Sequence, residues 1–355
     1  MKFSVDPSIQ MVPFYPKAAL YGADAGWTML SSNENPCEPS PMVVESIIHA
    51  LFDINRYPES EAELKTLIAQ KYGLKPQNVV IGNGSNEIIE AALRAARLQG
   101  RARVIVPSPS FAFYPIAASI YGFEAISVPL DGLRINLDWM RQHVDHATRV
   151  IFLCNPNNPT GTIFHDDAFL AFLKSLPPEV LVVVDEAYAE FSDSRQFPRS
   201  ISYINDFPVV VMRTFSKAYG LAGLRIGYGI GEESLISFIE RTKQPFSVNM
   251  IALTAAKAAL ADERHLQRVL DNNRKGKTFL SDSLEALGLA MVPTEANFVL
   301  IKVGPEAESL TKKLFDRKIV IRWLGGYGMT EYVRVTVGTM DENRTFIEAL
   351  KRIIR

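Results

Sequence analysis

The chain has 355 residues, of which 47% are hydrophobic and 22% are charged, a balance typical of a globular protein with a large core. Its 38 basic and 39 acidic residues give a net charge of −1, which argues against a nucleic acid or an anionic membrane surface as the main ligand. Cys37 and Cys154 are too few for a cysteine-bound metal cluster, and no apolar run approaches the length of a membrane span or a signal peptide core. We therefore expect no metal and a cytoplasmic location.

Two helices are predicted in the first part of the chain. The segment SPMVVESIIHALF, residues 40–52, opens with Ser-Pro, a signature of helix starts. In SEAELKTLIAQKYG, residues 60–73, Ser60 and Glu63 have the spacing of a capping box, and Gly73 is a stop signal. Leucine and isoleucine residues between these signals share one helix face.

Five short apolar runs follow in the middle of the chain, and each ends on glycine, proline or a polar residue. Because they are apolar throughout rather than alternating, they are typical of strands that are covered on both faces. With helical segments between them, they predict an α/β fold with a mostly parallel, doubly wound sheet. The runs are VVIGNGSNE (79–87), RVIVPSPSF (103–111), RVIFLCNPNNPTG (149–161), VLVVVDEAYAEF (180–191) and VVVMRTFSK (209–217).

The last third has a different pattern. Residues 248–287 have the composition of a long helical region, and three short β-branched runs follow: ANFVLIKV, IVIRWL and EYVRVTVGT. In the last run, valines alternate with Arg334 and Thr336, which predicts a half-exposed antiparallel strand. Asp341 is expected to cap the closing helix.

These patterns predict three parts. An N-terminal arm, residues 1–35, is expected to pack with the smaller domain. Residues 36–245 would form the large α/β domain, and residues 246–355 a smaller α+β domain.

Polar residues end all five apolar runs, at the sheet edge where open α/β sheets bind their ligands. Each pattern alone has an ordinary explanation, such as a turn, a loop, a helix cap or a solvated lysine. Their occurrence at one predicted edge favours a shared ligand site. The patterns are Gly84-Ser85-Asn86, Ser110-Phe111, residues 155–161, Asp185-Glu186-Tyr188, and Thr214-Ser216-Lys217.

The chemistry that these residues can share is that of a phosphorylated cofactor. A glycine-rich turn before NEIIEAALRAA presents backbone N–H groups to a phosphate, and Arg225, Ser216 and Thr214 can add partners. Asp185 follows an apolar run, where a carboxylate needs a partner such as a protonated ring nitrogen. Lys217 can form a Schiff base with an aldehyde. A lysine Schiff base and a carboxylate–pyridinium pair are together what pyridoxal 5′-phosphate (PLP) requires.

A set of motifs also resembles those of the histidinol-phosphate aminotransferases, which are PLP enzymes of the aspartate aminotransferase fold. The resemblance runs from about residue 28 to the C-terminus. SKAYGLAGLRIGY and PNNPTG are specific to the fold group, whereas NRYPE and VRVTVGT point to this branch. In chain order the motifs are SSNENP, NRYPE, GNGSNE, PNNPTG, VVVDEAY, RTFSKAYGLAGLRIGY, ANFVL and VRVTVGT.

The resemblance implies a role for each matching residue of the cofactor site. Lys217 would anchor the cofactor and then move the proton of the substrate Cα, and Asp185 would keep the ring nitrogen protonated. Asn158 and Tyr188 would bind the phenolic oxygen of the ring. Phe111 would stack on the ring where the family commonly has tyrosine, so that stacking is kept and a hydroxyl contact is lost. The residues implied around the phosphate are Gly84, Ser85, Asn86, Thr214, Ser216 and Arg225.

The same resemblance implies residues that contact the substrate and a partner subunit. Tyr57, in NRYPE, would reach the phosphate of the partner subunit's cofactor, so a homodimer is implied. Arg334 would hold the substrate α-carboxylate or its equivalent in a bidentate pair, and Arg322 the phosphate of the amino donor. Tyr15, in VPFYPKAAL, would belong to the substrate-facing arm. For both arginines, a solvated position on the surface is the alternative.

The reaction implied by the resemblance is the transfer of an amino group from L-histidinol phosphate to 2-oxoglutarate, which yields imidazole-acetol phosphate and L-glutamate. An aromatic amino-acid aminotransferase and a threonine-phosphate decarboxylase are alternatives on the same fold, and QPFSVN (244–249) resembles a stretch of the decarboxylase group. Lys217, Asp185 and Arg225 argue against a binding module that has lost catalysis. A nucleotide-binding oxidoreductase would leave Lys217 without a role, and GYGIG (227–231) lacks GxGxxG spacing and a preceding strand.

Overall fold

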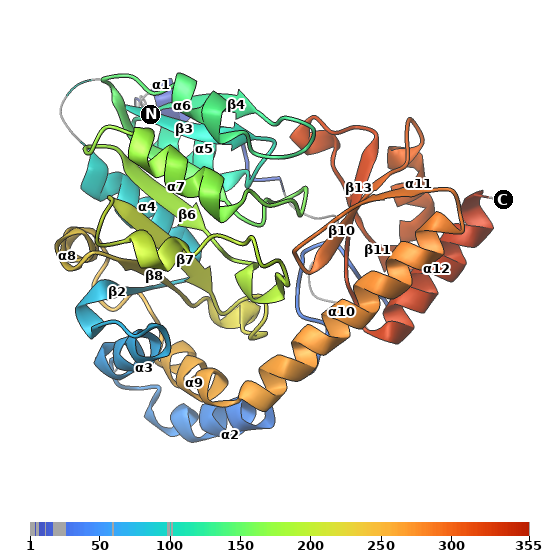
Figure 1. The fold of residues 1–355 in the computed structure, drawn as a ribbon. Coiled ribbons are helices and arrows are strands. Elements are labelled where there is room, and N and C mark those ends of the chain that lie inside the picture. Colours follow the sequence, from blue (N-terminus) through green and yellow to red (C-terminus); the bar gives the residue numbers. More distant parts are fainter. Residues whose placement is uncertain are drawn as a thin grey trace.

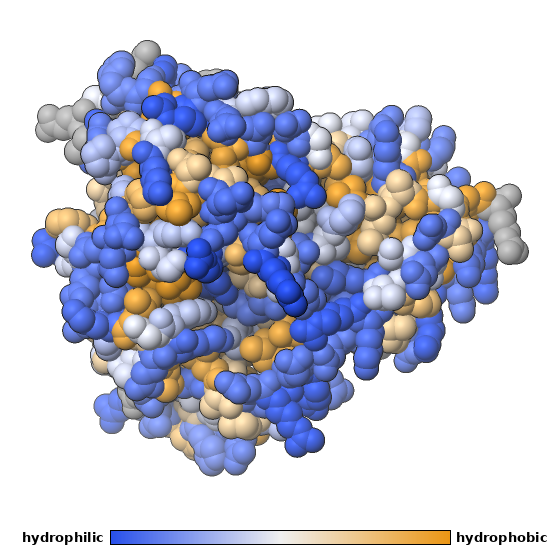
Figure 2. All heavy atoms as spheres, viewed as in Figure 1, coloured by the Kyte–Doolittle hydropathy of each residue, from blue (hydrophilic) through white to orange (hydrophobic). Residues whose placement is uncertain are grey.

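The computed structural model describes residues 4, 7–10, 12–16, 26–58, 60–97, 100 and 102–354. Figure 1 shows a large part built on one sheet and a smaller C-terminal part, with the long helix α10 (Glu263–Glu285) running from one to the other. On the face seen in Figure 2, hydrophilic residues predominate, and hydrophobic residues form smaller groups between them. No helix in these described ranges is long and apolar enough to cross a membrane.

The large part is organised around a seven-stranded sheet in the order β2-β8-β7-β6-β5-β3-β4. All pairings among β3 to β7 are parallel, whereas β8 runs antiparallel to both of its neighbours. The prediction of a mostly parallel α/β sheet is confirmed, and each of the five apolar runs contains a strand. The strands are β2 (Val79–Gly82), β3 (Arg103–Ser108), β4 (Glu124–Pro129), β5 (Thr148–Cys154), β6 (Leu181–Asp185), β7 (Val209–Thr214) and β8 (Gly227–Gly231).

Helices cover both faces of this sheet, which explains why its central strands are apolar throughout. Alternate residues enter different cores: Val182 and Val184 pack with one set of helices, and Val183 packs with the other. The first set is α3 (Ala62–Tyr72), α6 (Leu137–Gln142), α7 (Asp166–Ser175) and α9 (Met250–Ala261). The second set is α4 (Ser85–Ala96), α5 (Phe113–Ile120) and α8 (Glu233–Arg241).

Two strands of the large sheet were not predicted. GYGIG forms β8 itself, and its glycines permit this position: a Cβ at Gly227 would lie 2.7 Å from the Ser85 nitrogen and 2.9 Å from the Arg213 oxygen. Strand β4 lies at the sheet edge beside β3 alone. An edge strand needs less apolar surface, and in EAISVP the polar residues Glu124 and Ser127 interrupt the apolar ones, so the sequence gave no strand signal.

The C-terminal part contains a four-stranded antiparallel sheet in the order β12-β13-β10-β9, as the α+β prediction required. Its strands are β9 (Ala290–Val292), β10 (Phe298–Lys302), β12 (Arg322–Trp323) and β13 (Tyr332–Thr336). One core packs this sheet against α10, α11 (Ala307–Phe315) and α12 (Met340–Ile354).

The N-terminal segment contacts both parts of the molecule. Strand β1 (Thr28–Met29) pairs in parallel with β11 (Ile319–Val320) of the C-terminal part. The short helix α1 (Pro7–Gln10) contacts α5 in the large part. We retain domain limits near residues 35 and 245 as a proposal.

The predicted helix starts are partly wrong. Helix α2 (Pro41–Ala50) begins at the proline of Ser-Pro as expected, and Gly73 ends α3 with a left-handed φ of 66°. There is, however, no capping box at Ser60, because its hydroxyl closes a local turn by accepting from the Ala62 N–H at 3.2 Å. Glu63 instead forms an ion pair with Lys257 on α9.

Two expectations for the last third are also corrected. The long helical region is divided at Asp262, whose carboxylate accepts the N–H of His265 and so starts α10. Asp341 does not cap α12. Thr339 and Glu342 form a capping box there, in which the Thr339 N–H donates to the Glu342 carboxylate at 2.7 Å and the Glu342 N–H donates to the Thr339 hydroxyl at 3.2 Å.

Candidate active site

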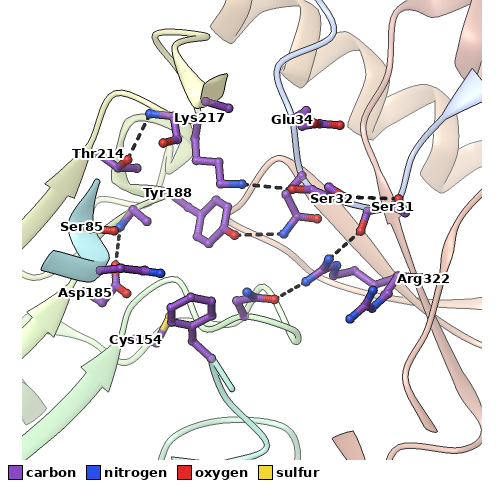
Figure 3. Close-up of a pocket in the computed structure, with 18 of the residues that line it drawn as sticks. Ser31, Ser32, Glu34, Ser85, Cys154, Asp185, Tyr188, Thr214, Lys217 and Arg322 are labelled. Carbon is purple, nitrogen blue, oxygen red and sulfur yellow. Dashed lines mark hydrogen bonds between the residues drawn. The ribbon is translucent and has the colours of Figure 1, made fainter. Parts of the chain in front are cut away.

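A cavity of about 410 Å³ lies at the carboxyl edge of the large sheet. Figure 3 shows that side chains from the strand ends and from the C-terminal part point into it from opposite sides. This volume is suited to a small-molecule ligand. All predicted cofactor and substrate residues except Gly84 and Tyr57 line it, namely Tyr15, Ser85, Asn86, Phe111, Asn158, Asp185, Tyr188, Thr214, Ser216, Lys217, Arg225, Arg322 and Arg334.

One end of the cavity is arranged for an anion. Gly84 has a φ of 70° and precedes α4, so the first N–H groups of this helix face the cavity edge where Ser85 lies. The Arg225 guanidinium packs directly against Gly84: a Cβ on Gly84 would lie only 2.3 Å from Nη2 of Arg225. Its Nη1 also donates to the Ser216 hydroxyl at 3.4 Å, and the Thr214 hydroxyl accepts from the Ser216 N–H at 3.1 Å. A helix N-terminus and a guanidinium therefore converge on one ligand position.

Lys217 follows β7 and extends into the middle of the cavity (Figure 3). Its Nζ donates to the backbone oxygen of Ser32 at 3.1 Å. Burial lowers the pKa of Lys217 to about 8, and the positive charge of Arg334 adds to the shift. Near neutral pH, a useful fraction of this amine is therefore unprotonated and nucleophilic.

Asp185 ends β6 on the cavity floor and is 4% exposed. One carboxylate oxygen accepts the Ala187 N–H at 3.1 Å, and the other accepts the Tyr114 hydroxyl at 2.7 Å. Burial raises the pKa of Asp185, and the hydrogen bond from Tyr114 opposes that shift. Tyr114 was not predicted as a site residue, although it lies only three residues beyond Phe111, in the first turn of α5.

A second unpredicted residue joins the two parts of the molecule at Tyr188. The side-chain amide of Asn33 donates to the Tyr188 hydroxyl at 3.0 Å, and the Asn33 N–H donates to the Thr336 hydroxyl at 2.9 Å. Asn33 has a φ of 55°, a conformation that asparagine tolerates better than most residues. The motif SSNENP contains this residue, but its sequence alone does not specify such distant partners.

Arg334 is 6% exposed, so the expectation of a half-exposed strand is wrong and the solvated alternative is excluded. It donates from Nη2 to the Ser31 oxygen at 2.8 Å and from Nη1 to the Asn158 side-chain oxygen. The valines of β13 enter the C-terminal core, and Arg334 lines the cavity on the other face. Alternation of apolar and polar residues along a strand does not show whether the polar side chains face solvent or line a cavity.

Arg322 lies directly opposite Arg334 in the pairing of β12 with β13. It is partly buried, lines the cavity and donates to the Pro16 backbone oxygen. Like charges at directly opposed positions of a sheet repel each other. This pair therefore favours an anionic ligand between or beside the two guanidinium groups.

The aromatic residues divide into two groups. Phe111 and Tyr15 both line the cavity and contact edge to face, with ring centroids 6.2 Å apart. Tyr57 does not line the cavity; it is 79% exposed and stacks on Phe246 at 4.7 Å. Glu59 of NRYPE and the KAAL portion of the predicted arm, residues 17–20, lie outside the described residues.

A doubly wound sheet with an amine, a buried carboxylate and an anion site at its carboxyl edge defines a PLP-dependent enzyme. Residues 25–350 match the family model of aminotransferase class I and II. The chain is 40% identical to the histidinol-phosphate aminotransferase of Moorella thermoacetica over 92% of its length and 85% of that protein, and 42% identical to that of Symbiobacterium thermophilum over 91% and 89%.

A solved structure agrees with these sequence relatives. The histidinol-phosphate aminotransferase of Sinorhizobium meliloti, in complex with PLP, superimposes with a TM-score of 0.90 and 28% identity over 100% of this chain and 98% of that chain. The chain belongs to the class I and II aminotransferase family, and within it to the histidinol-phosphate aminotransferases.

Proposed function

We propose that this chain is a cytoplasmic, PLP-dependent aminotransferase of histidine biosynthesis that transfers the amino group of L-histidinol phosphate to 2-oxoglutarate. The observation that carries this proposal is the opposed pair Arg322 and Arg334 in the same cavity as Lys217 and Asp185. It supplies an anion site beside a cofactor site. The relatives named above carry the same activity in their names.

The described residues fit PLP. Asp185 is a buried carboxylate whose oxygens face the cavity floor, where it is suited to hold a protonated ring nitrogen. Ser85, Ser216 and Arg225 would hold the phosphate, and Asn158 and Tyr188 the phenolic oxygen. When bound, PLP supplies an electron-accepting ring that stabilises negative charge at the substrate Cα.

In the proposed mechanism, Lys217 moves the proton. A pKa of about 8 allows its Nζ to take a proton from the substrate Cα and to return it near neutral pH. Asp185 would hold the ring nitrogen of the bound cofactor in its protonated form. Arg334 and Arg322 hold the anionic end of the substrate so that the Cα–H bond faces Nζ.

Both substrates have to use the same arginines. The amino donor has a phosphate and no α-carboxylate, whereas 2-oxoglutarate has two carboxylates. Because Arg322 and Arg334 are opposed on neighbouring strands, a phosphate can contact both of them, and a carboxylate can form a bidentate pair with Arg334.

The proposal is tested by single half-reactions. The PLP-loaded enzyme is mixed separately with histidinol phosphate, phenylalanine, glutamate and threonine phosphate, and its absorbance is followed as the pyridoxamine form appears. We expect the highest kcat/KM with histidinol phosphate. A faster reaction with phenylalanine would make the enzyme an aromatic aminotransferase, and CO2 release from threonine phosphate would make it a decarboxylase.

Gly84 and Arg225 lie together at the end of the cavity proposed to bind the PLP phosphate. We expect replacement of Gly84 with alanine to weaken PLP binding by about 10- to 100-fold, as for one lost charged hydrogen bond. The left-handed φ of 70° disfavours alanine, and the new methyl group would displace the Arg225 guanidinium. Titration of the apoprotein with PLP measures the effect. Gly223→Ala is a matched control, because a Cβ there has nothing within 4 Å. An unchanged affinity in Gly84→Ala would remove Arg225 from the phosphate site.

We also propose that the active form is a homodimer in which Tyr57 completes the partner's site. Exposed apolar side chains lie on α2 and on the segment between it and Tyr57, and Tyr57 itself stacks on the exposed Phe246; a second copy of the chain would cover them. They are Met42, Val44, Ile48, Leu51, Phe52 and Ile54, together with Phe246.

Subunit complementation tests this arrangement. Tyr57→Ala and Lys217→Ala proteins are dissociated, mixed and reassociated at a limiting PLP concentration. In a mixed dimer, one site has both Lys217 and the partner's Tyr57, so the mixture should recover about a quarter of wild-type activity. Tyr332→Ala, a tyrosine outside the cavity, is the control in place of Tyr57→Ala. Activity equal to the average of the separate proteins would contradict a shared site.

A further inference from the structure

Tyr114 is the one side chain of the described residues that donates a hydrogen bond to Asp185. Its hydroxyl lies 2.7 Å from the Asp185 carboxylate, and none of its surface is exposed. The ring is stacked on Phe152 with centroids 4.9 Å apart and an interplanar angle of 1°. It also meets Phe111 edge to face at 5.4 Å. Packing on two sides fixes the hydroxyl at the carboxylate.

From this geometry we propose that Tyr114 is a positioning residue for the cofactor, whose hydroxyl keeps Asp185 ionised and aimed at the ring nitrogen. The inference rests on the proposed role of Asp185. It adds a residue that the motifs do not assign and that does not line the cavity. Tyr114 therefore acts through Asp185 and does not touch the ligand.

The charges around Asp185 make this donor important. Four titratable groups face the carboxylate from the surrounding elements: Tyr114 from α5, Cys154 from β5, Tyr188 after β6 and Lys217 after β7. Burial raises the pKa of both Cys154 and Tyr188, so they stay neutral. Burial also raises the pKa of Tyr114, which therefore remains a donor at all working pH values.

What remains to stabilise the ionised carboxylate is limited. Lys217 is cationic only below a pKa of about 8 and is occupied once it holds the cofactor. The Ala187 N–H and the Tyr114 hydroxyl are then the two donors that oppose the cost of burial. The hydroxyl can be removed without altering the backbone.

The same segment also positions the stacking ring. Phe111 lies two residues before the start of α5, lines the cavity and contacts Tyr114 in the first turn of that helix. The two residues are therefore fixed by one packing arrangement, so a probe of Tyr114 has to separate electrostatics from packing. A Tyr114→Phe substitution keeps the stacked ring and removes the hydroxyl alone.

The test measures binding of pyridoxamine 5′-phosphate to the full-length apoprotein from about pH 8.5 down to the lowest pH at which the protein stays folded; this probe has no aldehyde and cannot attach to Lys217. Asp185 must be ionised to hold the protonated ring, so affinity is lost as acid protonates it. Tyr114→Phe is expected to raise the midpoint of that loss by roughly one pH unit. Its affinity near pH 8 should match the wild type. Protonation of the free probe also changes with pH, but it affects every variant equally and therefore does not alter the difference between their midpoints.

Tyr121→Phe is the matched control. Tyr121 ends the same helix and donates to a carboxylate, that of Glu90, at 2.8 Å, but neither group lines the cavity. Its midpoint should equal that of the wild type. In an Asp185→Asn background, Tyr114→Phe should produce no further shift, because the pair no longer contains a titrating group.

The outcomes distinguish failure of the proposed role of Asp185 from failure of the inference about Tyr114. If Asp185→Asn binds the probe like the wild type at every pH, the proposed role of Asp185 fails. If Asp185→Asn removes the pH dependence while Tyr114→Phe keeps the wild-type midpoint, the inference about Tyr114 is overturned. A uniform loss of affinity at all pH values in Tyr114→Phe would also overturn it, since packing alone explains that result. Thermal unfolding of each variant confirms that it is folded.

Discussion

Lys217→Ala is expected to lower the turnover of histidinol phosphate by about 10⁴-fold, the upper range for loss of a general acid–base group. Lys217 is the one lysine among the described residues that line the cavity, so no neighbouring amine can replace it. Its low pKa of about 8 is a consequence of burial, and an amine introduced at the surface would not reproduce it.

Two measurements check this result. Single-turnover rates give the loss of proton transfer, and borohydride reduction followed by peptide mass analysis shows whether the cofactor is attached to the segment at residues 214–229. Lys277→Ala is the matched control, because burial also lowers the pKa of Lys277 but its side chain lies outside the cavity. Wild-type turnover in Lys217→Ala would disprove the proposed mechanism.

The second large effect is expected at Arg334. Arg334→Ala should raise KM for 2-oxoglutarate by about 10- to 100-fold, which corresponds to a lost charged hydrogen bond. Arg334→Lys should recover only part of this loss, because lysine keeps the charge but not the planar fork that pairs with a carboxylate.

Arg322→Ala is the companion variant for Arg334. If Arg322 binds the phosphate of the amino donor, its loss raises KM for histidinol phosphate more than KM for 2-oxoglutarate. Because Arg334→Ala leaves the oxygens of Asn158 and Ser31 without their donor, unfolding temperatures are needed to separate binding from stability. Unchanged KM values for both substrates in both variants would show that neither Arg322 nor Arg334 binds the substrate.

The sheet and the floor of the site follow closely from sequence pattern. A strand that is covered by helices on both faces needs apolar residues at every position, so Val182, Val183 and Val184 are visible as a strand without any partner being known. Polar residues at the ends of such buried strands need partners for their polar groups, and a bound ligand can supply them. Asp185 and Lys217 were therefore accessible from local sequence.

The remaining parts depend on contacts between distant segments. Tyr114 acts on a carboxylate in another strand, and Asn33 joins Tyr188 to Thr336, so neither role has a local signal. Strand β8 has glycine at position 227 because backbone atoms of Ser85 and Arg213 approach it closely, and its glycines hide its strand character. The strand of Arg334 was predicted to be half-exposed because alternation shows only that a side chain leaves one core, and not whether it then meets solvent or a cavity.

The hydrogen bonds of Arg334 imply that ligands enter by exchange. In this structure the guanidinium already donates to a peptide oxygen of Ser31 and to the neutral amide of Asn158. A ligand binds there only if it offers better acceptors than these two groups. Carboxylates and phosphates do so, because charged acceptors form stronger hydrogen bonds than neutral ones. Alcohols, amides and other neutral ligands do not, so competition from the protein's own oxygens acts as a filter against uncharged metabolites.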